Sequence, residues 1–312
     1  MTSRLTVAFL SISSFVIILA SAGCGPAQKN LSHLPARELF TQAKAKYDQH
    51  KYASAIELFQ TVVYNYPGET IIDTAQYYLA LAYFGNQEYA LAGTEFNRYL
   101  INYPTSAYAA NAQFMKAVSA FEDTPKSSGL DQTELDDVIR QLKDFITDHP
   151  ESEVLSDARK YLAAAEERLA EKYYNGGITY SRLGAADAAK IYFQKVIDEY
   201  TDSKYAPMAS FNIAVEEMHL KHYDEARKRF ETFRTVFPNH PLAAKAAVEA
   251  RKAALKGAEA VYQKGDMKTA GEKFQALVKD FPDTGEARKA GSYLQKIREQ
   301  LPDTSKIGNA KS

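Results

Sequence analysis

Few residues of this chain have types and spacing that could do chemistry, and one of them is its single cysteine, Cys24. A lone thiol cannot form an internal disulfide or share a metal with other cysteines, so its position must explain it. His219 and His222 stand three residues apart and could serve as metal ligands on one helical face. The repeat described below puts them at a turn, and no third ligand is evident. We therefore expect a solvated turn and no metal.

Two pairs of adjacent carboxylates are the remaining candidates for acid and base catalysis. Asp136 with Asp137, and Glu166 with Glu167, are expected on exposed helix faces, because nothing implies a pocket or a histidine partner. The sequence contains neither a glycine-rich phosphate loop nor a serine-elbow motif. We therefore expect a protein that is not an enzyme.

The segment before Cys24, residues 1–23, has the layout of a bacterial secretory signal peptide. One basic residue is followed by an apolar stretch with interspersed serines and then by small residues. A retained membrane helix is the rival interpretation, because residues 5–22 approach the ~20 residues that a span requires. The serines and the Gly-Cys-Gly-Pro ending argue against it. The Ala-Gly-Cys sequence that ends at Cys24 resembles the bacterial lipobox, in which the cysteine is acylated and becomes the new N-terminus.

The lipobox resemblance implies a covalent N-acyl diacylglycerol lipid on Cys24, and we expect no other cofactor. Ser21 stands where a lipobox usually has leucine, so an ordinary signal peptide with a buried or idle cysteine is the alternative. Gly25 follows the cysteine, whereas aspartate there resembles an inner-membrane retention signal. We therefore expect the periplasmic face of the outer membrane. Residues 24–35 are expected to form a lipidated tether, whose polar part at 26–35 has ~17 Å r.m.s. reach.

The composition indicates a helical protein with protein partners. A formal net charge of -1 leaves no basic field to hold nucleic acid. Tryptophan is absent, but 21 tyrosines and 16 phenylalanines accompany many alanines. Aromatic rings packed against small residues suit closely spaced helices.

One apolar pattern recurs six times and predicts the fold. In the first copy, Tyr52, Ala55 and Phe59 follow at steps of three and four, which make one helical face. Pro67 then terminates the helix. The later terminators are Pro104, Pro150, Thr201, Pro238 and Pro282. An alanine stands eight residues after every terminator, at Ala75, Ala112, Ala158, Ala209, Ala246 and Ala290. Helix N-caps are expected two residues after four of the terminators, at Ser106, Ser152, Ser203 and Thr284.

Each unit is therefore a helix, a tight turn, a second helix and a stop, with no competing strand signal. This resembles the tetratricopeptide repeat, whose Ala-x-x-x-Phe and terminal proline match Ala55, Phe59 and Pro67. The resemblance covers residues 34–300. It implies an all-α, right-handed superhelical solenoid of about six helix pairs with a concave groove.

Two irregular spacings refine this resemblance. Nine extra residues fall in a polar loop at 122–133, and fourteen fall within 157–177, which contains no helix breaker before Gly176 and predicts one long helix. Together with the lipobox and the sequence DARKYL…LAEKYYNGGITYSRLGAADAA, these insertions resemble the BamD family of outer-membrane lipoproteins. That family usually has five repeats, whereas VYQKGDMKTAGEKFQALVKDFP makes a sixth here.

A row of aromatic residues marks the expected binding groove. In this repeat the groove is lined by residues three before and four after the small residue of each first helix. In the first three units these positions are all aromatic: Phe40, Tyr47, Tyr77, Phe84, Phe114 and Phe121. Such a groove would take an extended peptide that bears aromatic side chains. The alternative is that these rings only fill space between neighbouring helices.

The BamD resemblance implies a scaffold of the β-barrel assembly machinery that binds unfolded outer-membrane proteins. We expect residues 36–150 to hold the precursor. We expect residues 151–301 to dock to the BamA-like central barrel protein and to the other lipoproteins of the machine, and residues 302–312 to form a disordered tail. The alternative is an adaptor of cell-envelope or division coordination similar to the CpoB group, although that group normally has a coiled coil and is usually not lipidated. A regulatory lipoprotein of another repeat family also stays open.

Overall fold

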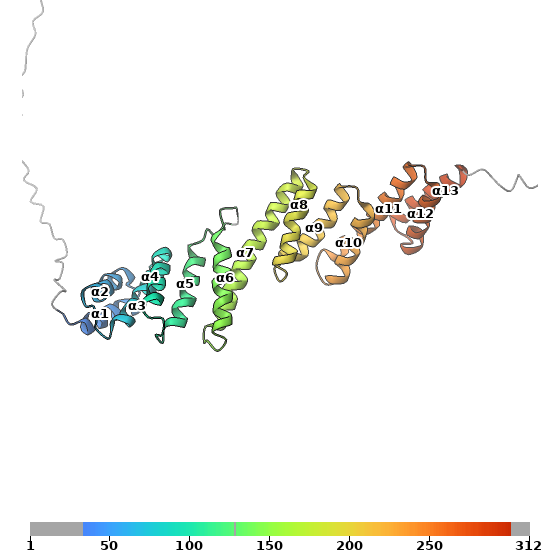
Figure 1. Ribbon diagram of the computed structural model, residues 1–312. Helices are drawn as coiled ribbons and strands as arrows, with labels where there is room; N and C mark the ends of the chain where they lie inside the picture. Colours follow the sequence, from blue (N-terminus) through green and yellow to red (C-terminus); the bar gives the residue numbers. More distant parts are fainter. Residues whose placement is uncertain (1–33, 128, 301–312) are drawn as a thin grey trace, which may run out of the picture.

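The computed structural model describes residues 34–127 and 129–300, which form thirteen α-helices and no strands. The helices follow one another along a single long axis, so the two ends of the described chain lie at opposite ends of the molecule (Figure 1). They are α1 (Ala36–Asp48), α2 (Tyr52–Asn65), α3 (Ile72–Gly85), α4 (Tyr89–Asn102), α5 (Ala109–Asp123), α6 (Glu134–Asp148), α7 (Leu155–Arg182), α8 (Ala186–Glu199), α9 (Tyr205–His219), α10 (Tyr223–Val236), α11 (Ala243–Gln263), α12 (Met267–Asp280) and α13 (Gly285–Gln300).

The helices pair into six units, from α1 with α2 to α11 with α12, and α13 closes the array. Each helix packs on its neighbours in the chain, and the stronger of the longer contacts join a helix to the next but one, as between α5 and α7. The buried apolar side chains form four successive clusters along the axis instead of one central core. Each unit is therefore stabilised by its neighbours, as in other repeat proteins. The predicted all-α solenoid of helix pairs is confirmed.

The predicted terminators mark where the second helices end. All six of these helices end two residues before the terminator, and the residue between leaves the helical region, as Tyr66 does with φ -124° and ψ 54°. Proline disfavours helical backbone in the residue before it, which explains five of the ends. Tyr200, which precedes Thr201, has nearly the same angles, φ -130° and ψ 51°.

The small residues lie where helices approach closely. The six alanines that follow the terminators are fully buried. Gly177, in α7, is also buried, and a Cβ atom placed on it would lie 2.5 Å from Cε1 of Phe193 in α8. A side chain larger than hydrogen at Gly177 would therefore push α7 and α8 apart.

Three of the four predicted N-caps are wrong. The helices after Ser106, Ser152 and Ser203 begin two or three residues after the serine, and their N-caps are Tyr108, Val154 and Lys204. Ser106 and Ser152 instead accept a backbone N–H two residues on, which forms a turn before the helix. Thr284 is a cap as predicted, because its Oγ1 accepts the N–H of Ala287 at 3.1 Å.

Both predicted insertions are present. Residues 124–133 connect α5 to α6, and α7 is a continuous helix of 28 residues. Because of its length, α7 contacts two helices on either side, α5 and α6 before it and α8 and α9 after it.

Candidate functional site

An open cavity of about 540 Å³ lies where the third unit meets the long helix α7. Three of the six predicted groove residues line it: Phe84 from the end of α3, and Phe114 and Phe121 from α5. The other lining residues are Met115, Val118, Asp157, Lys160, Tyr161 and Ala164. The lining is mainly apolar, so the cavity suits an apolar or aromatic side chain.

The aromatic walls of the cavity hold one another in place. The Tyr161 ring meets Phe121 edge-on, with ring centroids 5.5 Å apart, and Phe114 at 6.0 Å. Phe114 also packs against the fully buried Phe145 of α6, at 5.6 Å. Such contacts fix the ring orientations before any ligand arrives, which lowers the entropic cost of binding.

Arg168 of α7 contacts Phe121, one of the aromatic walls of the cavity. Its guanidinium carbon lies 3.9 Å from the centroid of the Phe121 ring, within the range of a cation–π contact. Its Nη1 donates to Oγ1 of Thr124 at 2.9 Å, which ties the 124–133 loop to α7. Burial lowers the pKa of Arg168. This arginine therefore positions Phe121 and the loop but does not line the cavity.

The other three predicted groove residues lie between helices and not at the cavity. Phe40 and Tyr47 both contact the Tyr78 ring, at 6.0 and 5.6 Å. Tyr77 is buried and stacks on Tyr108 at 4.6 Å, and burial raises the pKa of its hydroxyl to about 12. Their packing matches the space-filling alternative, and a role for them in peptide binding stays a prediction.

The sequence reasoning missed Met115 and Tyr161, which also line the cavity. Both stand three residues after the recurring alanine of their unit, at the position that Tyr78 occupies in α3. That position faces the preceding unit in each case, because Tyr78 contacts Phe40 and Phe59 of the first unit. A count from the recurring alanine would therefore have found them.

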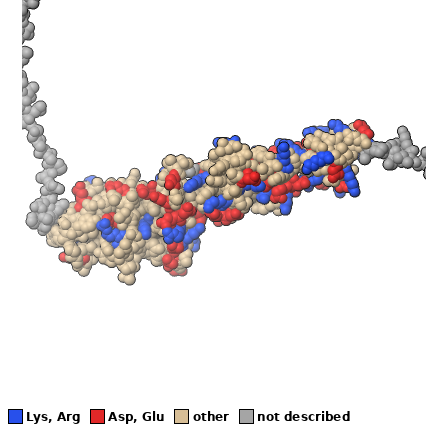
Figure 2. Space-filling view, turned by 45° about the horizontal axis from the view of Figure 1, so that its top comes forward, with Lys and Arg blue, Asp and Glu red and all other residues tan. Residues whose placement is uncertain are grey.

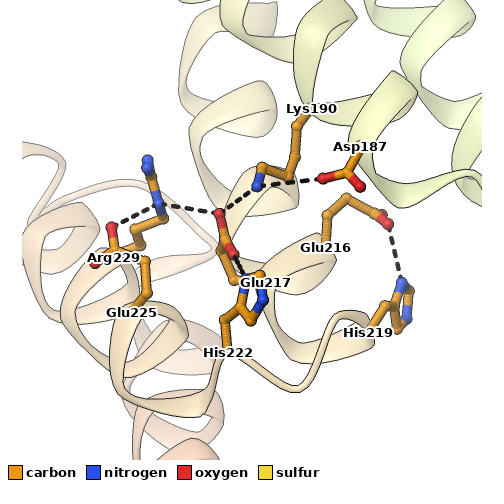
Figure 3. Close-up of polar contacts among 8 residues, drawn as sticks. All are labelled: Asp187, Lys190, Glu216, Glu217, His219, His222, Glu225 and Arg229. Carbon is orange, nitrogen blue, oxygen red and sulfur yellow. Dashed lines mark hydrogen bonds and ion pairs between the residues drawn. The ribbon is translucent and has the colours of Figure 1, made fainter.

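The predicted histidine pair lies at the turn between α9 and α10 (Figure 3). Each exposed imidazole contacts one buried carboxylate: His219 Nδ1 lies 3.0 Å from Glu216 Oε2, and His222 Nδ1 lies 2.8 Å from Glu217 Oε2. The position at a turn is confirmed. Within residues 34–127 and 129–300, no group of three or more His, Cys, Asp or Glu residues could hold a metal ion.

Glu217 is the centre of an ionic cluster that joins three helices (Figure 3). Lys190 of α8 lies 2.7 Å from its carboxylate, and Arg229 of α10 lies 3.8 Å away. Burial alone would raise the pKa of Glu217, but hydrogen bonds from Lys190 and His222 outweigh it and lower the pKa. The neighbouring Glu216 accepts from Ser181 of α7 at 2.6 Å. Units 4 and 5 are therefore held together by charge at this point.

Asp136 and Asp137 are exposed as predicted, but Glu166 and Glu167 are half-buried and line an open cavity of about 420 Å³, so the expectation of no pocket is wrong for that pair. Members of both pairs form ion pairs. Glu166 pairs with Lys143 at 2.8 Å, and Glu167 pairs with Lys204 at 3.1 Å. Asp137 pairs with Arg140 one helical turn away.

Cys24 and the signal segment lie outside the described residues. Among the described helices, none has both the length and the apolar character that crossing a bilayer requires.

Comparison with known proteins identifies the family. Similar solved structures include a TPR2AB domain from yeast, with TM-score 0.38, 16% identity, and coverage of 84% of this chain and 98% of that chain. A tetratricopeptide-repeat protein from Bacteroides fragilis has TM-score 0.36, 14% identity, and coverage of 86% and 99%. The search of curated proteins finds no match. The sequence profile of YfiO, described as outer membrane lipoprotein, matches residues 32–214, which is more than half of the chain. The chain therefore belongs to the YfiO family of outer membrane lipoproteins, the BamD family.

Proposed function

We propose that this protein is a lipid-anchored periplasmic scaffold of the β-barrel assembly machinery that holds unfolded outer-membrane protein precursors. Family membership supports the assembly role. The single observation that supports precursor binding is the aromatic cavity between α3, α5 and α7. Because its walls include Asp157, Lys160, Tyr161 and Ala164, the proposed precursor site extends beyond the predicted boundary at residue 150.

The cavity is proposed to take an aromatic side chain of a strand from the precursor. Burying such a ring gains about 1.5–3 kcal/mol, and further contacts along the concave face would add to this. Lys160 and Asp157 at the rim form an ion pair with each other, 2.8 Å apart. Because these two charges offset each other, apolar contact is expected to dominate the recognition.

Filling the cavity is the experiment that tests precursor binding. Ala164 is exposed and lines the cavity, so Ala164→Phe should occupy it without removing a core residue. We expect a fluorescent peptide with the alternating aromatics and terminal phenylalanine of a barrel's last strand to bind about tenfold or more weakly, as loss of one buried ring implies. Fluorescence anisotropy measures the affinity.

The neighbouring Ala163 supplies the matched control. It is exposed too and lies on the same helix, but it does not line this cavity. Ala163→Phe should therefore bind the peptide as the wild type does. Equal affinity of Ala164→Phe and the wild type, with unchanged helical circular dichroism, would refute the proposed site.

Acylation of Cys24 is the proposed anchor. Each buried methylene adds about 0.8 kcal/mol, and one chain alone binds only marginally, so the several chains of an acylated cysteine hold a domain durably. Mass spectrometry of the mature N-terminus should find a diacylglycerol thioether on Cys24, and Cys24→Ser should leave the membrane fraction. An unmodified Cys24 in the mature protein would refute the anchor.

Units 4 to 6 are proposed to dock to the central barrel protein of the machine. Within these units the basic excess lies at the C-terminal end: residues 215–300 contain 17 Lys and Arg against 13 Asp and Glu, whereas residues 151–214 contain 8 against 10. This basic excess favours an acidic partner surface. Purification of the native protein in mild detergent should recover a large outer-membrane barrel protein. Its consistent absence would favour the adaptor of envelope or division coordination.

A further inference from the structure

The outward face of α4 carries exposed apolar side chains. Leu91, Thr94, Arg98 and Ile101 follow at steps of three and four, so they share the helix face opposite the fully buried Phe96. Ile101 is 71% exposed and Leu91 is 47% exposed. The two apolar side chains lie about 15 Å apart along the helix, with Thr94 and Arg98 between them.

This face continues onto α2 and carries no unbalanced charge. The exposed Tyr64 of α2 accepts a hydrogen bond from Arg98 Nη1 at 2.9 Å. Arg98 also pairs with the carboxylate of Glu95 at 3.1 Å. We call the set of Tyr64, Leu91 and Ile101 the outer patch. Its chemistry is apolar with one tyrosine hydroxyl and a neutralised cation, as at a membrane interface.

The surrounding end of the molecule is poor in charge. Residues 34–104 contain 12 Asp, Glu, Lys and Arg among 71 residues, whereas residues 105–300 contain 60 among 196. On the face in view in Figure 2, charged side chains are sparser at this end than over the rest of the molecule. A charge-poor surface loses little hydration when it approaches lipid headgroups.

The first described residue, Leu34, lies near the C-terminal end of α2, the helix that contains Tyr64 of the outer patch. Tyr66, two residues beyond Tyr64, donates its hydroxyl hydrogen to the carbonyl oxygen of Leu34 at 2.8 Å. Ten residues separate Cys24 from Leu34, so even a fully extended tether reaches only about 35 Å. A lipid on Cys24 would therefore hold this end of the solenoid close to the bilayer.

We propose that the outer patch rests on the lipid surface, with α4 against the headgroups. This proposal rests on the anchor in the proposed function. Three apolar side chains are too few for durable binding by themselves, but a short tether raises their effective concentration at the membrane. No residue of α4 lines the aromatic cavity, so lipid contact leaves the cavity open.

The absence of tryptophan gives a direct test, because one introduced tryptophan is the only one in the chain. Leu91→Trp and Ile101→Trp report from the outer patch. Ile191→Trp is the matched control, because Ile191 on α8 is 70% exposed but lies two units away.

Each chain, from residue 24 onward, is coupled through its single thiol at Cys24 to maleimide lipid in vesicles of phosphatidylethanolamine and phosphatidylglycerol. This coupling supplies the anchor whether or not cells acylate Cys24, so failure of the patch and failure of the anchor are distinguishable.

On coupling, the emission of both outer-patch reporters should shift to shorter wavelength, and brominated acyl chains should quench it. The Ile191→Trp emission should keep the wavelength of a solvated indole. Unshifted emission from both outer-patch reporters would overturn the proposal. An equal shift from Ile191→Trp would also overturn it, because the contact would then not be specific to this face.

Discussion

Tyr83 in α3 and Glu217 in α9 occupy the same position of the repeat, three residues after the fully buried alanines Ala80 and Ala214. Both are buried, and both reach the second helix of the preceding unit. The Tyr83 hydroxyl accepts from Gln60 Nε2 of α2 at 2.6 Å, and Glu217 pairs with Lys190 of α8 at 2.7 Å. We call the contact of Tyr83 with Gln60 the neutral joint and the contact of Glu217 with Lys190 the ionic joint. The same contact between units is therefore neutral near the N-terminus and ionic in the C-terminal half.

The position in the repeat therefore determines which helix the side chain contacts. The residue type at that position determines whether the contact between the two units is neutral or ionic. The neutral joint lies in the region with few charges, next to the aromatic cavity and the outer patch. In the ionic joint, Glu217 lies just beyond residue 214, where the match to the family profile ends, while its main cation Lys190 lies within the match. A buried carboxylate requires its own cations, whereas the neutral joint needs only one hydrogen bond.

Exchange of the residue type at the neutral joint should have the largest effect. Burial, and next the charge of Glu95, raise the pKa of the Tyr83 hydroxyl, so a carboxylate in its place would meet a repulsive charge. Tyr83→Glu should lower the free energy of unfolding by about 3–5 kcal/mol, as expected for a buried unpaired charge. Urea denaturation followed by circular dichroism measures the loss.

Tyr83→Phe is the matched control, since it removes only the hydrogen bond from Gln60. It should cost about 1 kcal/mol. A Tyr83→Glu protein as stable as this control would show that the surroundings do not dictate the residue type at this position.

Removing the main cation from the ionic joint should have the next largest effect. Lys190→Ala leaves the Glu217 side chain, which is 4% exposed, with only His222 and Arg229. We expect a loss of about 2–3 kcal/mol in the free energy of unfolding, below the full cost of an unpaired buried charge. Adding Glu217→Leu to Lys190→Ala should recover part of the loss, because the stranded charge is then gone.

Lys195 provides the control on the same helix. It pairs with Glu199 at 2.9 Å on the surface, where both side chains are exposed. Lys195→Ala also removes a cation–π contact with the Tyr173 ring at 4.7 Å, and should cost about 1 kcal/mol in all. Equal losses for the two lysine variants would mean that burial adds nothing to the ionic joint.

The periodic parts of this fold could be predicted from the sequence. Proline, alanine and aromatic spacing located the ends of all six second helices, the long α7 and the loop at 124–133. These features follow from local rules of helix termination and close packing, which one sequence contains in full.

The arrangement of the site could be predicted only in part. Phe84, Phe114 and Phe121 reach the cavity, but Tyr77 has the same residue class and an equivalent register and stacks on Tyr108 in the interior. Phe114 and Tyr77 differ because of the first helix of the unit that follows each of them. The long helix α7 faces α5 at the cavity, whereas the shorter helix α5 is the next first helix after α3. The sequence alone likewise assigned His219 and His222 to a turn but missed the buried Glu216 and Glu217 behind them.

The pH dependence of stability should differ in sign between the two joints. The pKa of Glu217 is lowered, so its contribution is present above its unfolded pKa of about 4.3 and is lost as pH falls through the folded value. Burial, opposed by Arg98, raises the pKa of Glu95 beside Tyr83, so protonation of Glu95 favours the folded state as pH falls.

Unfolding free energies measured across the acid range for the wild type, Glu217→Gln and Glu95→Gln isolate these effects, because the contributions of all other carboxyl groups cancel in the differences between variants. The advantage of the wild type over Glu217→Gln should shrink as pH falls below about 4.3. Its advantage over Glu95→Gln should grow at higher pH, as pH falls from the raised folded pKa of Glu95 toward about 4.3, and should level off below that value. Differences that change in the same direction for both variants would contradict the division into a neutral and an ionic joint.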